Sequence, residues 1–233
     1  MPHTPTAQAP SPQATAAPVP PGLVVLHADE HLLVLDKPAG LLSVPGRGED
    51  KQDCLSARAQ DRFPDALIVH RLDMATSGLM VMGRGAEAQR RLSLAFEQRR
   101  VHKRYVAVVE GVVRPTLADG AWAVIDLPLI VDWLARPRSK VDHDMGKPSI
   151  TRWRVAPQAS PLPGTTRLEL EPLTGRSHQL RVHLQAMGHP IVGDPLYAPP
   201  QFAVDRLLLH AQRLTVPHPV SGEPCAFQSP CPF

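Results

Sequence analysis

Residues 70–78 read HRLDMATSG and interrupt an otherwise apolar part of the chain. The run ALIV (residues 66–69) precedes this segment, and LMVM (residues 79–82) follows it. A polar insert between two short apolar runs is typical of a loop that joins two buried strands and faces a cleft. From its position alone, Asp73 in this loop has several roles open to it: nucleophile, general base, metal ligand or former of a structural turn.

A second polar segment, LTGRSHQLRVH, covers residues 173–183 and precedes or opens a helix expected over residues 178–187. Backbone N–H groups at a helix start, together with an arginine, form a site for an anion or a carboxylate. This arrangement favours a pairing of Arg176 with Asp73 that keeps the carboxylate ionised. The alternative, that Arg176 merely ties two segments together, stays open at this point.

A third segment, VHKRY (residues 101–105), crowds basic side chains at the start of a strand expected over residues 105–110. Its aromatic residue, Tyr105, is one of two tyrosines in the chain. A tyrosine can stack on a nucleobase, and its phenol can move a proton. For a tyrosine taken singly, the ordinary interpretation, a half-buried residue in a strand, is favoured.

The rest of the chain mixes strands and helices without a regular alternation, which predicts an α+β fold with a largely antiparallel sheet. Hydrophobic periodicity and turn residues predict the following elements. They are a hairpin that begins at residue 23, helices over residues 51–62 and 86–100, strands over residues 152–155, 166–172 and 207–216, a long loop over residues 128–148, and an irregular end.

Composition narrows the class of protein. The 233 residues are 43% hydrophobic, which suffices for a sizeable core, and a net charge of +3 permits a polyanionic partner without requiring one. Three cysteines form no disulfide framework and suit a reducing cytoplasm. Neither a metal-binding pattern nor an apolar run long enough to span a membrane is predicted. Residues 1–22 contain no Lys, Arg, Asp or Glu and are predicted to be a disordered tail.

Taken together, HRLDMATSG, the Lys103-x-Tyr105 pair and TGRSHQLRVH, in this order, resemble the RluA-type pseudouridine synthases. DKPAGLLSVPG (residues 36–46), GDPLY (residues 193–197) and RLLLHA (residues 206–211) are similar to further segments of that family. The resemblance covers residues 23–233. It implies one mixed α+β catalytic domain with a central cleft and no S4-type RNA-binding domain.

The resemblance implies a role for each matching residue. Asp73 would be the nucleophile that isomerises uridine to pseudouridine, either by attack on the ring or sugar or by assisting glycal formation. Arg176 would hold and orient that carboxylate, and Tyr105 would pack on the target ring and help remove the proton from C5. Arg71 would enter the RNA stack where the uridine leaves. The family needs no metal and no organic cofactor.

Residues 126–140 and 43–51 are similar to the dual-specificity branch, which modifies a 23S rRNA hairpin loop and the tRNA anticodon stem-loop. A cytoplasmic monomer without protein partners is expected. The alternatives are a single different rRNA or tRNA target and a non-catalytic RNA-binding module, whereas metal-hydrolase and serine-hydrolase motifs are missing. The expected substrate-binding residues, besides Arg71, are His70, Thr76, Lys103 and Leu208, with Arg136, Arg138 and Lys140 on phosphates.

Overall fold

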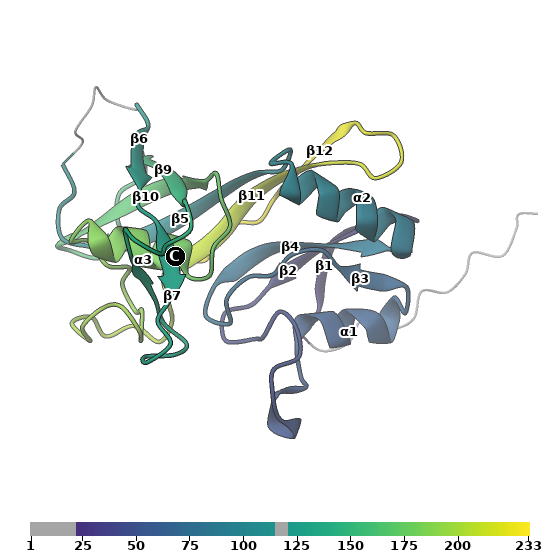
Figure 1. The fold of residues 1–233 in the computed structure, drawn as a ribbon, viewed down its shortest axis with the longest axis horizontal. Helices are drawn as coiled ribbons and strands as arrows, with labels where there is room; N and C mark the ends of the chain where they lie inside the picture. The colour runs from purple at the N-terminus through teal and green to yellow at the C-terminus, as the bar shows by residue number, and fades with distance from the viewer. Residues whose placement is uncertain (1–21, 115–120) are drawn as a thin grey trace, which may run out of the picture.

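The computed structural model of the chain describes residues 22–114 and 121–233. The predicted disordered tail therefore lies, apart from Gly22, outside the described residues. Within them, ten strands form one sheet with the order β1-β2-β4-β11-β5-β10-β9-β6, while β3 pairs with β4 and β12 pairs with β11 (Figure 1). The α+β class and the largely antiparallel sheet are confirmed, because β4 and β11 form the one parallel pair among these strands.

The sheet strands, the hairpin β7–β8 and the helices have the following bounds. The strands are β1 (Val24–Ala28), β2 (Leu32–Lys37), β3 (Ala66–Ile68), β4 (Ser77–Arg84), β5 (His102–Glu110), β6 (Ala123–Asp126), β7 (Leu129–Val131), β8 (Ser139–Val141), β9 (Ile150–Val155), β10 (Thr165–Pro172), β11 (Leu209–Pro217) and β12 (Pro224–Gln228). The helices are α1 (Leu55–Arg62), α2 (Ala86–Glu97) and α3 (Gln179–Ala186), with a 3-10 turn at Glu49–Lys51.

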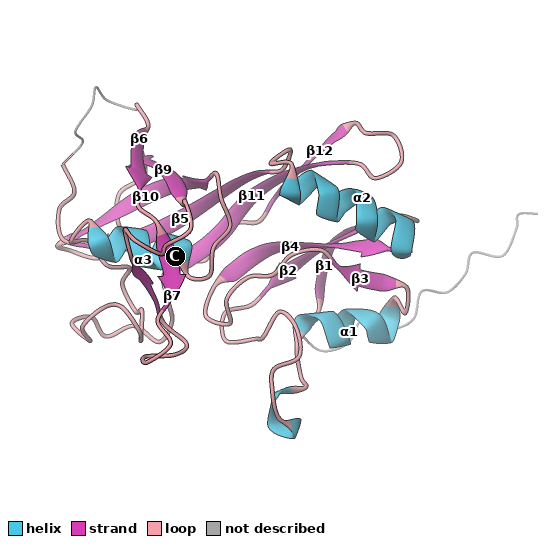
Figure 2. Ribbon diagram, viewed as in Figure 1, coloured by secondary structure: helices cyan, strands magenta, loops and turns pink. Residues whose placement is uncertain are grey.

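Both faces of the β2–β4 pair are covered by helices, which explains their unbroken apolar runs. Successive side chains of a strand point to opposite faces. Val34 and Val81 accordingly pack with Leu92 of α2, whereas Leu35 and Met80 pack on the other face with α1. Figure 2 shows α1 and α2 on opposite sides of these strands. A strand buried on both faces needs continuous hydrophobicity rather than alternation.

In the other half of the sheet, β10 has one buried face. In β10 the buried Leu168 and Leu170 join a core cluster with Leu180 and Leu184 of α3, as the alternation in the sequence predicted. The glutamates of β10 lie on the opposite face, where Glu171 pairs with Arg104 and Arg152. The two halves meet at the parallel contact of β4 with β11.

Two sequence predictions about elements are wrong, and one strand was missed. Residues 128–148 contain the hairpin β7–β8, paired from Leu129↔Val141 to Val131↔Ser139, where a long loop was expected. The irregular C-terminal end contains β12, and β6 was not predicted. These strands are only three to five residues long, so they form because a neighbour offers unpaired backbone groups. None of the helices among the described residues is long and apolar enough to cross a membrane.

Candidate active site

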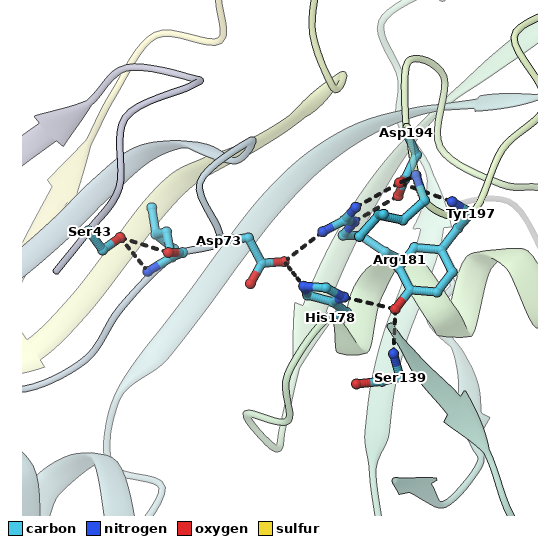
Figure 3. A network of polar contacts seen from close by, with 9 residues as sticks. Ser43, Asp73, Ser139, His178, Arg181, Asp194 and Tyr197 are labelled. Carbon is cyan, nitrogen blue, oxygen red and sulfur yellow. Dashed lines mark hydrogen bonds and ion pairs between the residues drawn. The ribbon is translucent and has the colours of Figure 1, made fainter. Parts of the chain in front are cut away.

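Asp73 lies in the loop between β3 and β4, and the backbone on both sides of it is pinned. Ser43 Oγ donates to the carbonyl of Leu72 at 2.7 Å and accepts from its N–H at 3.0 Å (Figure 3). The carbonyl of Met74 accepts from Lys37 Nζ at 3.0 Å and from the Gly40 N–H at 2.9 Å. The prediction of a polar loop between two strands is confirmed, and this loop is rigidly anchored. Of the two strands, β4 is buried, whereas β3 is only partly buried.

Glycine is required where this loop enters β4. Gly78 has a φ of +109°, in the region that side-chain-bearing residues rarely adopt. A Cβ there would also collide with the backbone of Ala211, on the adjoining strand β11. The two halves of the sheet therefore approach each other closely directly after the HRLDMATS segment.

A cleft of about 590 Å³ opens at this junction, and most of the predicted site residues line it. The lining includes Asp73, Arg71, His70, Thr76, Lys103, Tyr105, Arg176, Arg181 and Leu209. Segments far apart in the sequence, from the β3–β4 loop, β5, the loop before α3 and β11, are thus brought to one place. The expected central cleft is confirmed in position.

The carboxylate of Asp73 is held by Arg181. Arg181 Nη1 donates to Asp73 Oδ2 at 3.3 Å, and its Nε and Nη2 donate to the two oxygens of Asp194 at 2.7 Å each. The Arg181 side chain is 4% exposed and that of Asp194 is fully buried. A guanidinium offers donors in a planar fork, so one side chain serves both carboxylates at once.

The prediction that Arg176 pairs with Asp73 is wrong. Arg176 is exposed on the rim of the cleft, and its Nε donates to the carbonyl of Pro148 at 3.4 Å. The reason is geometric: Arg176 precedes the helix, whereas Arg181 lies in the first turn of α3 and points inward. A signal was present in the sequence, because Arg181 lies between Leu180 and Val182, and an arginine that is buried with such neighbours needs an acceptor.

Tyr105 and Lys103 reach the cleft from alternate positions of β5, while Arg104 points to the opposite face and pairs with Glu171. Burial, reinforced by the negative charge of Asp73, raises the pKa of the Tyr105 hydroxyl well above its ordinary value, so the phenol stays protonated at neutral pH. Burial lowers the pKa of Lys103 to about 8. Lys103 is therefore a cation close to its titration range.

His70 and Thr76 lie near the two ends of the loop between β3 and β4. His70 stacks on Phe96 with ring centroids 4.6 Å apart, and its Nε2 accepts from the Val81 N–H at 3.0 Å. Burial lowers the pKa of His70 to about 3, and nearby Lys103 acts in the same direction, so the imidazole is neutral. Thr76 is buried and lies directly before the first residue of β4. His70 thus supports the loop backbone as well as lining the cleft.

The expectation that Leu208 contacts substrate is wrong. Leu208 packs in a buried cluster with Val108 and Val192, and its neighbour Leu209 lines the cleft instead. Since side chains alternate across a strand, a shift of one residue moves the side chain to the other face.

The predicted phosphate contacts Arg136, Arg138 and Lys140 lie on the β7–β8 hairpin, which packs beside α3 and does not line the cleft. The Arg136 guanidinium stacks 3.1 Å from the ring centroid of Trp133. Trp133 is 70% exposed. The hairpin therefore presents a basic and aromatic surface next to the cleft, a combination that suits an RNA backbone and its bases.

Among the described residues, no group of three or more His, Cys, Asp or Glu side chains is arranged to hold a metal ion. The polar groups that line the cleft include a carboxylate, a phenol and several cations. These groups suit acid–base or nucleophilic catalysis on a bound polyanion.

Comparison with known proteins assigns this site to a class. The family model described as RNA pseudouridylate synthase matches residues 31–186, a span that includes Asp73, Tyr105 and Arg181. The chain belongs to the RNA pseudouridylate synthase family and is an isomerase that converts uridine to pseudouridine.

The individual relatives point in the same direction. The Dual-specificity RNA pseudouridine synthase RluA of Escherichia coli (strain K12) is 48% identical over 215 residues, which cover 91% of this chain and 95% of the relative. The protein of that name from Yersinia pestis is 46% identical, over 91% of this chain and 100% of its own.

Solved structures share the fold. Human RNA Pseudouridylate Synthase Domain Containing 1 superposes with a TM-score of 0.74 at 27% identity, covering 96% of this chain and 87% of its own. Human RNA Pseudouridylate Synthase Domain Containing 4 superposes with a TM-score of 0.70 at 26% identity, covering 90% and 88%.

Proposed function

We propose that this pseudouridine synthase modifies two kinds of RNA, an rRNA hairpin loop and the tRNA anticodon stem-loop. The observation that carries the proposal is the similarity, at 46–48% identity over nine tenths of the chain, to relatives named dual-specificity enzymes. The exposed basic hairpin beside the cleft supports it, because such a surface binds the phosphates of a stem without reading its sequence.

Asp73 is proposed as the nucleophile. The shortest contacts of Arg181 and of His178 both go to Oδ2, at 3.3 Å and 3.9 Å, and the other oxygen, Oδ1, points away from both side chains (Figure 3). In the isomerisation the N1–C1′ bond breaks, a C5–C1′ bond forms, C5 loses a proton and N1 gains one. Oδ1 of a fixed carboxylate serves attack on the ring or sugar, or assistance to glycal formation.

Tyr105 is proposed to pack on the uracil ring rather than to act as a phenolate base. Its side chain lines the cleft, and its raised pKa keeps the hydroxyl protonated at neutral pH. The protonated phenol stacks on the base and donates a hydrogen bond. The resemblance in sequence implied that the phenol also helps to remove the C5 proton, and this assignment omits that role.

The target uridine must leave its stack to enter the cleft. Unstacking costs a few kcal/mol and is least costly in a loop. Arg71 is exposed and lines the cleft, so we assign it to the space that the uridine vacates. Arg176, on the rim, is reassigned to a phosphate of the bound RNA, together with Arg136, Arg138 and Lys140.

The test is tritium release from C5-labelled uridine in an anticodon stem-loop and in an rRNA hairpin loop. Release from both RNAs by the wild type, abolished in Asp73→Asn without loss of RNA affinity, supports the proposal. Release from one RNA alone refutes dual specificity and leaves a single-target synthase. Turnover by Asp73→Asn within tenfold of the wild type would exclude Asp73 as the nucleophile.

We further propose that residues 23–233 act as one catalytic domain, as a cytoplasmic monomer. The described residues carry three free cysteines, which suits a reducing compartment. Sedimentation equilibrium at micromolar concentration tests the monomer, and a concentration-dependent doubling of the mass would refute it.

A further inference from the structure

A chain of polar contacts runs from the β7–β8 hairpin to the catalytic carboxylate (Figure 3). The Ser139 N–H donates to Tyr197 Oη at 2.7 Å, and Tyr197 Oη lies 2.8 Å from His178 Nδ1. The opposite ring nitrogen, His178 Nε2, lies 3.9 Å from Asp73 Oδ2. Three segments that are remote in sequence therefore meet behind Asp73: the start of β8, the GDPLY segment and the N-cap of α3.

The hydrogen bonds favour one tautomer of His178, in which Nδ1 accepts and Nε2 carries the proton. Tyr197 Oη already accepts the Ser139 N–H, so its own proton is free to be donated to His178 Nδ1. The ring proton then sits on Nε2 and faces the negative oxygen of Asp73. Burial lowers the pKa of His178, which keeps this imidazole neutral at physiological pH. His178 thus presents a dipole, not a charge, to the carboxylate.

Tyr197 also contacts two arginines, Arg138 and Arg181. The ring of Tyr197 is 4% exposed, and its centroid lies 5.3 Å from the guanidinium carbon of Arg138 and 5.0 Å from that of Arg181. The Tyr197 N–H donates to Asp194, the carboxylate that anchors Arg181. One side chain therefore joins a predicted phosphate-binding residue to both groups that face Oδ2 of Asp73.

The backbone of His178 adds a constraint. Its φ of +56° lies in the left-handed region, which an ordinary side chain adopts at a cost. The ring packs edge-on against Tyr197, with centroids 5.6 Å apart. A strained backbone persists where surrounding contacts fix it, and here those contacts aim the imidazole at Asp73.

We propose that Tyr197 and His178 are positioning residues that couple RNA docking on the β7–β8 hairpin to the orientation of Asp73. RNA bound at Arg138 fixes the start of β8, Ser139 fixes Tyr197, and Tyr197 fixes the tautomer and angle of His178. The inference rests on the proposed role of the hairpin in RNA binding and of Asp73 as nucleophile. It assigns a function to GDPLY and to the histidine of TGRSHQLRVH.

The first test is Tyr197→Phe, which keeps the ring and removes Oη. We expect kcat on the anticodon stem-loop to fall about threefold to tenfold, with KM nearly unchanged. The matched control is Thr166→Val, which removes a buried hydroxyl that also makes two hydrogen bonds, to Val113 N–H and the Gly111 carbonyl, away from the cleft. An unchanged kcat in Tyr197→Phe, with stability lost as in the control, means a structural role and overturns the proposal.

The pH profile is a second readout. The groups that face His178 are Asp73, Arg181, Asp194, Arg71 and the Tyr197 hydroxyl. Without the donated hydrogen bond on Nδ1, the imidazole accepts a proton more readily and becomes a cation beside Asp73. As pH drops from 7.5 towards 6, we expect the activity of Tyr197→Phe to fall more steeply than that of the wild type. The reason is that the pKa of the His178 imidazole is higher in the variant. Parallel profiles contradict the coupling.

A measurement without RNA separates this inference from the proposed function. In the free protein, NMR titration should show a higher pKa for His178 in Tyr197→Phe than in the wild type. An identical His178 pKa in the two proteins overturns the proposed positioning role of Tyr197, even if both RNAs are substrates. Should Tyr197→Phe fail to fold, His178→Asn replaces it, since asparagine tolerates the left-handed backbone. That variant should lower kcat with KM retained, and unchanged turnover refutes the proposal.

Discussion

Arg181→Met removes the guanidinium that donates to both Asp73 and Asp194. The variant leaves Asp194, whose side chain is fully buried, with the backbone N–H groups of Leu196 and Tyr197 as its remaining donors. Removing one partner of a buried ion pair costs roughly 3–5 kcal/mol. Because two backbone donors remain, we expect the lower end, about 3 kcal/mol, or ~6–12 °C in Tm for a chain of this length.

The effect on turnover has a different origin. Arg181 Nη1 lies 3.3 Å from Asp73 Oδ2, and a hydrogen bond to a charged group contributes about 1.5–3 kcal/mol. If that contact orients Asp73 in the transition state, kcat should fall about 10- to 150-fold. Urea denaturation measures the first effect, and tritium release, under conditions where the variant is folded, measures the second.

The double variant Arg181→Met/Asp194→Asn is the control. An asparagine still accepts the backbone N–H groups but carries no charge, so most of the lost stability should return. Activity should not return, because Asp73 still lacks its arginine. Two outcomes would show that Arg181 only neutralises Asp194 and does not orient Asp73. One is recovery of stability and activity together in the double variant, and the other is a kcat within threefold of the wild type in the single variant.

Three further predictions concern Lys37, the hairpin and Arg71. Burial lowers the pKa of Lys37 from 10.5 to about 8, so between these values the unfolded chain holds more protons; the urea-derived free energy of unfolding should rise with pH there, and less in Lys37→Met. An equal rise in both would contradict the burial argument. Replacing Arg136, Arg138 and Lys140 with Gln should reduce the salt slope of RNA binding by about two to three units, and an unchanged slope would remove the hairpin from the interface. Arg71→Ala should slow turnover on stem-loops more than on unstructured RNA, whereas equal losses would reject its role in flipping.

The sequence by itself determined the class of fold and the location of the cleft. The unbroken apolar run after HRLDMATSG required a strand buried on both faces, and the polar segment before it required a loop; alternation in β10 required one covered face. These patterns are local, since they depend on which side chains must leave water. The motifs were likewise enough to indicate the family before any contact was known.

Only the tertiary structure decided which arginine holds Asp73. Arg176 and Arg181 are five residues apart in one motif, and the inward direction of the first turn of α3 selects Arg181. The choice of Leu209 over Leu208 depended on strand register in the same way. A short segment, as in β7–β8, becomes a strand only when a partner satisfies its backbone. The sequence indicated that Arg181 needs a buried acceptor but not which one, because the direction of a side chain and the pairing of a short strand are set by neighbours remote in sequence.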